Sequence, residues 1–144
     1  MSTNKILNIL LLISITTGLN SFTGPKFDNA LKTAEQTAKK INTNFNSKNP
    51  SVENLRQLTK ELVPQLKLIP VSLQQTKDTF IIQKESPTTS GAITWEQEIS
   101  KQKFFNDINN IEKLNKQVTK PKQFQEIVQD INNFFITYFD TTIN

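Results

Sequence analysis

The stretch FFNDINNIEKLNKQ, residues 104–117, carries its apolar side chains at helical spacing among Asn, Lys and acidic residues. Apolar residues three and four positions apart share one face of an α-helix, and similar spacing continues on both sides of this stretch. The stripe consists of Trp95, Ile99, Phe104, Ile108, Ile111 and Val118. Thr94 and Gln97 match a capping box at its start. We therefore predict an amphipathic helix that begins at Thr94.

Three further stretches show helical periodicity. Residues 26–46 repeat apolar positions at spacings of four and three, and residues 122–140 do so again. A helix that begins at Ser51 contains Pro64, which removes a backbone hydrogen bond and is expected to kink or split the helix. Residues 76–93 lack this period, and we expect an irregular connection in which residues 80–82 form a short extended segment.

Four amphipathic helices, two pairs of which have short connections, predict an all-α fold. We expect an up-down-up-down four-helix bundle that occupies residues 25–144 as one domain. Residues 1–24 resemble a signal peptide, because Lys5 is the sole charged side chain before the apolar run ILNILLLISI and small residues follow it. The run is short for a membrane span, so a cleaved export leader is favoured over the alternative, a retained anchor.

The chain contains no Cys and no His, which excludes Cys nucleophiles, Ser-His-Asp relays, His-ligated metals and disulfides. Neighbouring acids such as Glu96 and Glu98 do not present paired carboxylates on one helix face. Phosphate-binding loops need glycines, and the chain has only three. We therefore expect a non-catalytic protein with no cofactor and no bound metal.

Lysines concentrate around the two short connections of the predicted bundle. In an up-down arrangement these connections share one end, where seven cations would converge as a partner-docking surface. The seven are Lys39, Lys40, Lys48, Lys113, Lys116, Lys120 and Lys122. From Gln123 onward the last helix carries no cation, so we expect a charge-polarised molecule that attracts an acidic partner. The alternative is that these lysines only complement helix dipoles and solvate the surface.

Two residues bear on the kind of partner. Arg56 is the only arginine, whereas nucleic-acid recognition favours arginine, so we expect a protein partner and no nucleic acid. Trp95 is expected to cap the other end of the bundle, with a binding anchor as the alternative.

The stretch FFNDINNIEKLNKQ, a short break and FQEIVQDINNFFITY together resemble the last two helices of the PsbQ family, extrinsic lumenal subunits of photosystem II. The matching positions are Phe105, Asn106, Asp107, Glu112, Lys113, Leu114, Asp130, Phe134 and Phe135. SVENLRQLTKELVPQLKLIPVSL resembles the family's second helix through Glu53, Arg56 and Pro64. The similarity covers about two thirds of the chain. The chain differs from the family in two ways: it has neither the lipobox Cys of cyanobacterial members nor the bipartite transit peptide of plant members.

This resemblance implies a non-catalytic subunit in the thylakoid lumen, peripheral to the membrane. Such a subunit stabilises the oxygen-evolving complex and its retention of calcium and chloride, and binds neither pigment nor metal. Its partners would be the photosystem II core and other extrinsic subunits, contacted through the seven lysines. The alternative is a secreted helical protein-interaction module, an effector or adhesin, of a bacterium with an AT-rich genome.

Overall fold

The computed structural model describes residues 24–143 of the chain. This part divides into two compact units. The sheet unit comprises residues 24–28 and 70–101, and the helical unit comprises residues 29–69 and 102–143. The predicted export leader lies, apart from its last residue, outside the described residues.

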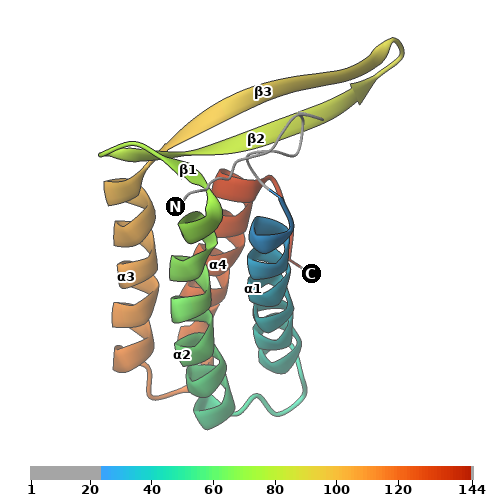
Figure 1. The fold of residues 1–144 in the computed structure, drawn as a ribbon. Helices are drawn as coiled ribbons and strands as arrows, with labels where there is room; N and C mark the ends of the chain where they lie inside the picture. The colour runs from blue at the N-terminus through green and yellow to red at the C-terminus, as the bar shows by residue number, and fades with distance from the viewer. Residues whose placement is uncertain (1–23, 144) are drawn as a thin grey trace. The chain divides into compact units, whose positions relative to one another are not determined.

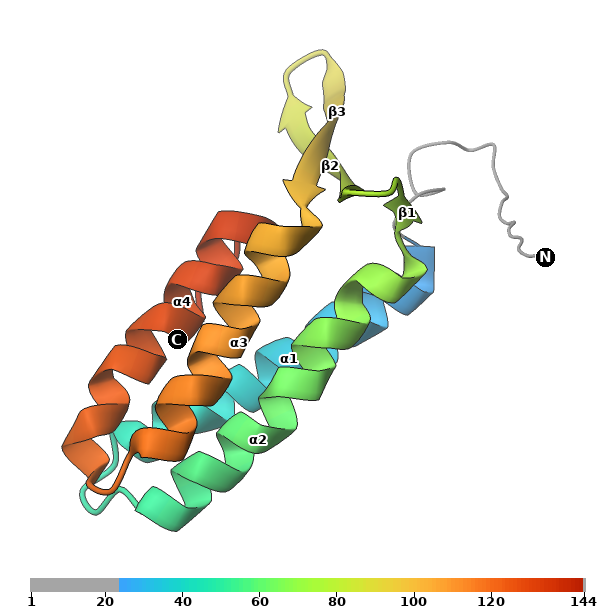
Figure 2. The ribbon, with the colours of Figure 1, turned by 90° about the vertical axis from the view of Figure 1, so that its left-hand side faces the viewer.

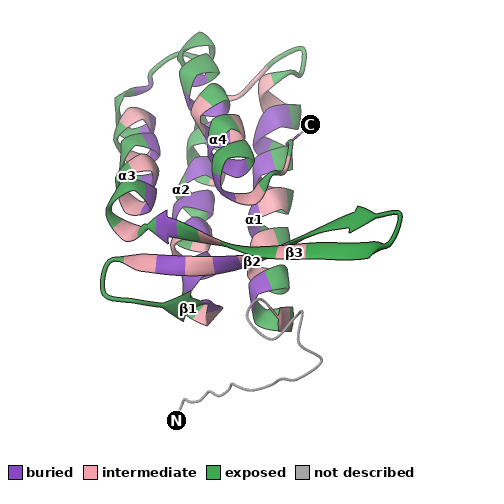
Figure 3. Ribbon diagram, turned by 90° about the horizontal axis from the view of Figure 1, so that it is seen from above, coloured by how far each residue is buried: buried purple, intermediate pink, exposed green. Residues whose placement is uncertain are grey.

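The helical unit contains four α-helices that lie side by side, each antiparallel to the one that follows it (Figures 1 and 2). The helices are α1 (Gly24–Phe45), α2 (Val52–Leu68), α3 (Lys101–Gln117) and α4 (Phe124–Phe139). Figure 3 shows that their buried residues gather on the inward faces. The first turn of α1 and the first residue of α3 belong to the sheet unit.

Helix α2 shows how local chemistry sets a helix boundary. The Ser51 hydroxyl accepts a 3.2 Å hydrogen bond from the Asn54 N–H, and Glu53 follows in the first turn. Of the two outcomes expected at Pro64, a kink or a split, the split does not occur, because α2 runs through this residue. A proline inside a helix destabilises it by about 3 kcal/mol. The free energy gained by burying Val63 and Leu66 beside it offsets this cost. A short 3₁₀ helix, η1 (Ile69–Ser72), follows α2.

The interior of the helical unit is built from the apolar stripes. Phe104, Phe134 and Tyr138 form its aromatic part, with ring centroids 4.8–5.0 Å apart. Tilted and edge-to-face geometries of this kind are favourable beyond the area that they bury. The other large, fully buried side chains of this unit include Ile41, Leu55, Leu62, Leu66, Ile69, Ile108, Ile111, Phe124, Ile127 and Phe135.

The sheet unit contains three antiparallel strands in the order β1-β2-β3. They are β1 (Gln74–Gln75), β2 (Thr79–Thr88) and β3 (Gly91–Ser100). The β2–β3 register runs from Thr79 opposite Ser100 to Thr88 opposite Gly91, which leaves a two-residue turn between the strands. Gly91 has a φ of 136°, a conformation that side chains disfavour. The predicted irregular connection over residues 76–93 is therefore an ordered hairpin arm.

The expected all-α fold, an up-down-up-down four-helix bundle over residues 25–144, is wrong, because the sheet makes this a mixed α/β protein. Residues 94–100 belong to β3, and α3 begins at Lys101 rather than at Thr94. The physical reason is the period of the side chains: Ile93, Trp95 and Ile99 occupy alternate positions, with Thr94 and charged residues between them. A spacing of four residues from Trp95 to Ile99 fits a helix and a strand equally well.

Replacement of Leu62, which is fully buried in α2, tests the core of the helical unit. Leu62→Ala should lower the free energy of unfolding by about 2–5 kcal/mol, because it leaves a cavity. Leu68→Ala on the same helix is the matched control, since Leu68 is 60% exposed and should lose less than about 1 kcal/mol. Urea denaturation measures both values, and equal losses would contradict this packing.

Candidate docking surface at the lysine-rich end

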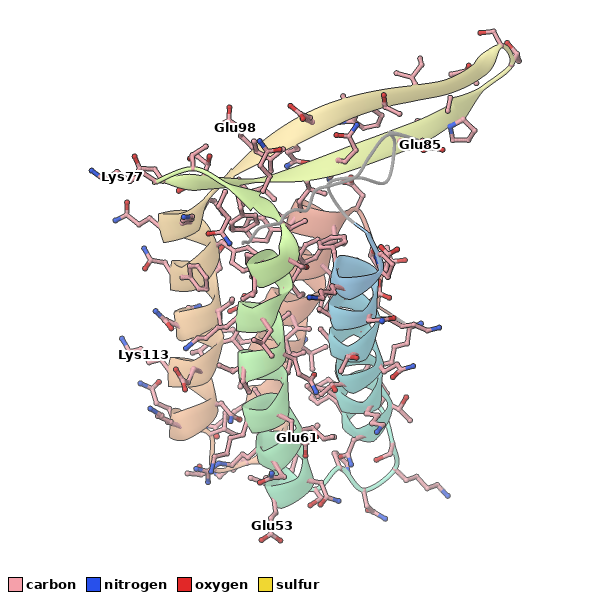
Figure 4. The ribbon with its side chains drawn as sticks, in the orientation of Figure 1. Glu53, Glu61, Lys77, Glu85, Glu98 and Lys113 are labelled. Carbon is pink, nitrogen blue, oxygen red and sulfur yellow. The ribbon has the colours of Figure 1, made fainter. Side chains whose placement is uncertain are left out.

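The two short connections lie at the same end of the helical unit (Figures 1 and 2). One joins α1 to α2, and the other joins α3 to α4 through the 3₁₀ helix η2 (Pro121–Gln123). The structure brings all seven predicted docking lysines to this end, in the last two turns of α1 and α3 and in the connections. All seven are exposed, and Lys113 points away from α3 in Figure 4. We call these seven residues the lysine-rich end.

Hydrogen bonds fix the α1–α2 connection that carries Lys48. The Ser47 hydroxyl donates to the Asn44 carbonyl oxygen at 2.7 Å. The Ser51 N–H donates to Oδ1 of Asn44 at 3.3 Å. Asn44 therefore ties the start of the connection to its end, which restricts where Lys48 can lie.

The α3–α4 connection is held by a single side chain. Oε1 of Gln123 accepts hydrogen bonds from the backbone N–H groups of Thr119 and Lys120, at 2.7 and 2.9 Å. The buried Asn115 also donates from Nδ2 to the Arg56 carbonyl oxygen at 3.1 Å, which braces α3 against α2. Both connections thus present their lysines from ordered backbone, so little backbone entropy is lost when a partner binds.

Charge is distributed unevenly along the helical unit. Residues 38–59 and 110–130, which form the end with the connections, carry eight cationic side chains and four carboxylates. The rest of the unit carries four of each. None of the seven lysines forms an ion pair with another described residue. The net charge of +4 at this end is therefore not neutralised within the described chain.

Helix dipoles account for few of these lysines. A cation stabilises a helix C-terminus when it lies in the last turn. The last turn of α1 contains no basic residue, and the last turn of α3 contains only Lys116. Helices α2 and α4 begin at this end, where cations are unfavourable. Interaction with a helix dipole thus explains only one of the seven lysines, Lys116. The other six are better explained by docking or by solvation of the surface.

A second polar cluster joins α3 to α4 in the other half of the helical unit. Oδ2 of Asp107 accepts a 3.0 Å bond from Nζ of Lys103 and a 2.5 Å bond from the Tyr138 hydroxyl. Nζ of Lys103 also lies 3.2 Å from Oη of Tyr138. These side chains adjoin a groove of about 200 Å³. Its lining residues are Lys103, Asp107, Asn110, Asp130, Asn133, Phe134 and Thr137.

The electrostatics of this cluster favour its unreactive protonation states. Burial, together with the hydrogen bond to Asp107, raises the pKa of Tyr138. Hydrogen bonds to Tyr138 and Asp107 raise the pKa of Lys103. Burial and the nearby Glu126 raise the pKa of Asp130. At neutral pH Lys103 is therefore protonated and Tyr138 neutral, so the cluster holds two helices together and offers neither an amine nor a phenolate nucleophile.

The sequence interpretation missed this cluster. Lys103 and Asp107 are four residues apart, a spacing that signals an ion pair on one helix face. Tyr138 is the only tyrosine of the chain. Its position opposite Asp107 depends on how far α4 is displaced along α3, which periodicity does not specify.

Trp95 lies on β3 with 44% of its surface exposed, so the prediction that it starts a helix is wrong. Among residues 24–143, no group of three or more metal-ligating side chains is close enough to hold an ion. None of the helices described there is long and apolar enough to cross a bilayer.

Helices α3 and α4 contain the two segments on which the resemblance to the PsbQ family rests. Comparison of the chain with family models, with curated proteins and with solved structures found no match. The resemblance therefore stays a prediction from the sequence.

Titration of Tyr138 tests the cluster directly, because phenolate absorbance reports on this one residue. We expect a pKa above the ordinary value of 10.0. Asp107→Asn should lower it toward that value, because the negative charge that opposes ionisation is removed. Lys103→Met should raise it further, since a cation beside the phenolate is lost.

The same shift predicts a pH dependence of stability. Above pH 10 the unfolded chain loses its phenolic proton first, so the free energy of unfolding should fall as pH rises toward the folded pKa. The Tyr138→Phe variant removes this contribution and serves as the control. An unshifted titration in the wild-type protein would contradict both the burial of Tyr138 and its hydrogen bond to Asp107.

Proposed function

We propose that the protein is a non-catalytic binding module that docks on an acidic protein surface through its lysine-rich end. The supporting observation is the set of seven exposed lysines that converge from two ordered connections and form no ion pair with the described residues. Absence of His and Cys from the sequence, and the protonated state of Lys103, are consistent with binding rather than chemistry.

The chemistry of lysine defines how such docking would work. Each ammonium group is strongly hydrated on a flexible stem, so a single exposed contact contributes about 0.2–1 kcal/mol. A cluster of like charges acts mainly on the rate at which the two partners meet, and can raise association rates roughly 10- to 1,000-fold at low salt. Salt screens both effects. The docked state should therefore form quickly and be released by moderate salt.

One specific form of this proposal is an extrinsic subunit on the lumenal face of photosystem II. It rests on the resemblance of α3 and α4 to the PsbQ family and on the expected export leader. The sheet unit is a departure from the all-α four-helix plan that this resemblance implies. The alternative form, a secreted effector or adhesin, uses the same lysines on a different protein partner.

Photo-cross-linking tests the docking surface. A photoreactive amino acid in place of Lys120 should give a discrete protein adduct in the native compartment, and moderate salt should abolish it. The same substitution at Lys32 is the matched control, since Lys32 is exposed on α1 outside the lysine-rich end. Equal adducts at the two positions, or an adduct at Lys120 that high salt leaves unchanged, would contradict the proposal.

Fractionation separates the two forms of the proposal. A photosystem II subunit should co-purify with photosystem particles and be stripped from them by moderate salt. If the protein is absent from such particles while the Lys120 adduct forms elsewhere, the photosystem form fails and the general docking proposal stands.

A further inference from the structure

Strand β3 lies at one edge of the described sheet. It is the last strand in the order β1-β2-β3, and no other strand within residues 24–143 pairs with its outer side. The outer edge of β2 is protected twice. β1 pairs with it at Phe80 and Ile81, and Pro87 near the turn has no N–H to donate. Exposed strand edges without such protection are templates for pairing with another strand.

The hydrogen-bond pattern shows which backbone groups this edge presents. The Lys101 N–H donates to the Asp78 carbonyl oxygen at 2.9 Å, continuing the β2–β3 register by one position. Bonded and non-bonded pairs alternate in an antiparallel ladder, so the odd-numbered residues of β3 bond to β2. The N–H and C=O groups of Ala92, Thr94 and Glu96 therefore point to the outer edge.

The side chains along this edge are sorted by face. Ile93 and Trp95 lie on the same face as the buried Ile99, yet they are 57% and 44% exposed. Thr94, Glu96 and Glu98 lie on the opposite face (Glu98 is labelled in Figure 4). The strand thus offers an exposed apolar face and an acidic face along one open edge.

We propose that β3 pairs with β3 of a second copy of this chain, antiparallel and about a two-fold axis at Thr94. In this register Ile93 of each copy faces Trp95 of the other. Thr94 faces itself, a favourable cross-strand pair. Glu96 faces the small Ala92. The two hairpins then form one continuous sheet, with the exposed apolar side chains gathered on one face.

Charge disfavours the registers whose axis lies at Glu96 or Gln97. A two-fold axis at Glu96 would place that carboxylate opposite itself, and an axis at Gln97 would place Glu96 opposite Glu98. Like charges directly opposite each other destabilise a strand pair. The two-fold axis is therefore expected nearer the β2–β3 turn. An axis at Thr94 places Ile93 of each copy opposite Trp95 of the other.

The contact is small compared with the roughly 1,200–2,000 Å² buried in a stable complex. A weak, concentration-dependent dimer is therefore expected. It would carry two lysine-rich ends, so that an acidic partner with two sites could be bound bivalently.

Sedimentation equilibrium of the full-length chain, from about 10 µM to about 1 mM, tests the pairing. Thr94→Pro removes an outward N–H without a loss of β2–β3 bonds and should leave the protein monomeric. Glu85→Pro is the matched control, because Glu85 lies directly opposite Thr94 and its N–H points to the edge of β2. Wild type and Glu85→Pro should dimerise. A monomeric wild type, whether its β3 edge is bare or covered by another extended segment, overturns the proposal.

Cysteine cross-linking tests the register independently of proline. The chain has no Cys, so single replacements of Ala92, Thr94, Glu96 and Glu98 report on one position each. Residue 94 faces its own copy at a Cα separation of roughly 5.5 Å, within disulfide range. Disulfide-linked dimers should therefore form fastest with Thr94→Cys. Equal rates at all four positions, or the fastest rate with Glu98→Cys, would overturn the proposed pairing.

Discussion

Burial of one apolar stripe on each of four helices is the constraint on which the helical unit depends. The stripes repeat at spacings of four and three residues, so each helix has one face that must leave water. Antiparallel packing of successive helices then places both short connections at one end. Lysines near those connections are excluded from the interior and accumulate at that end. Burial of the apolar stripes therefore also determines where the positive charge gathers.

The sequence was sufficient to predict α1, α4, the start of α2 and the convergence of the seven lysines, but not that α2 continues through Pro64. These follow from helical periodicity and from short connections, which are local properties. The start of α3 could not be predicted in this way, because Trp95 and Ile99 fit helical and strand periods alike. The two-residue alternation from Ile93 onward was the available signal. The cluster of Lys103, Asp107 and Tyr138 was missed, since it depends on the displacement of α4 along α3.

The two units contribute different kinds of surface. The helical unit has its cationic surplus at the lysine-rich end and an apolar interior sealed by Phe104, Phe134 and Tyr138. The sheet unit presents a strand edge that is open within residues 24–143, with an acidic face and two exposed apolar side chains. Long-range attraction of hydrated charges and short-range backbone pairing act independently. A protein with both can bind a partner by charge while it associates with itself by strand pairing.

Chemical-shift mapping tests the central claim most directly. The uniformly ¹⁵N-labelled full-length chain is titrated with poly-glutamate at low salt, and backbone amide shifts are followed. The proposed docking predicts that perturbations cluster in residues 39–48 and 113–122 and disappear at high salt. Perturbations spread evenly over the lysines of both units, or unchanged at high salt, would contradict it.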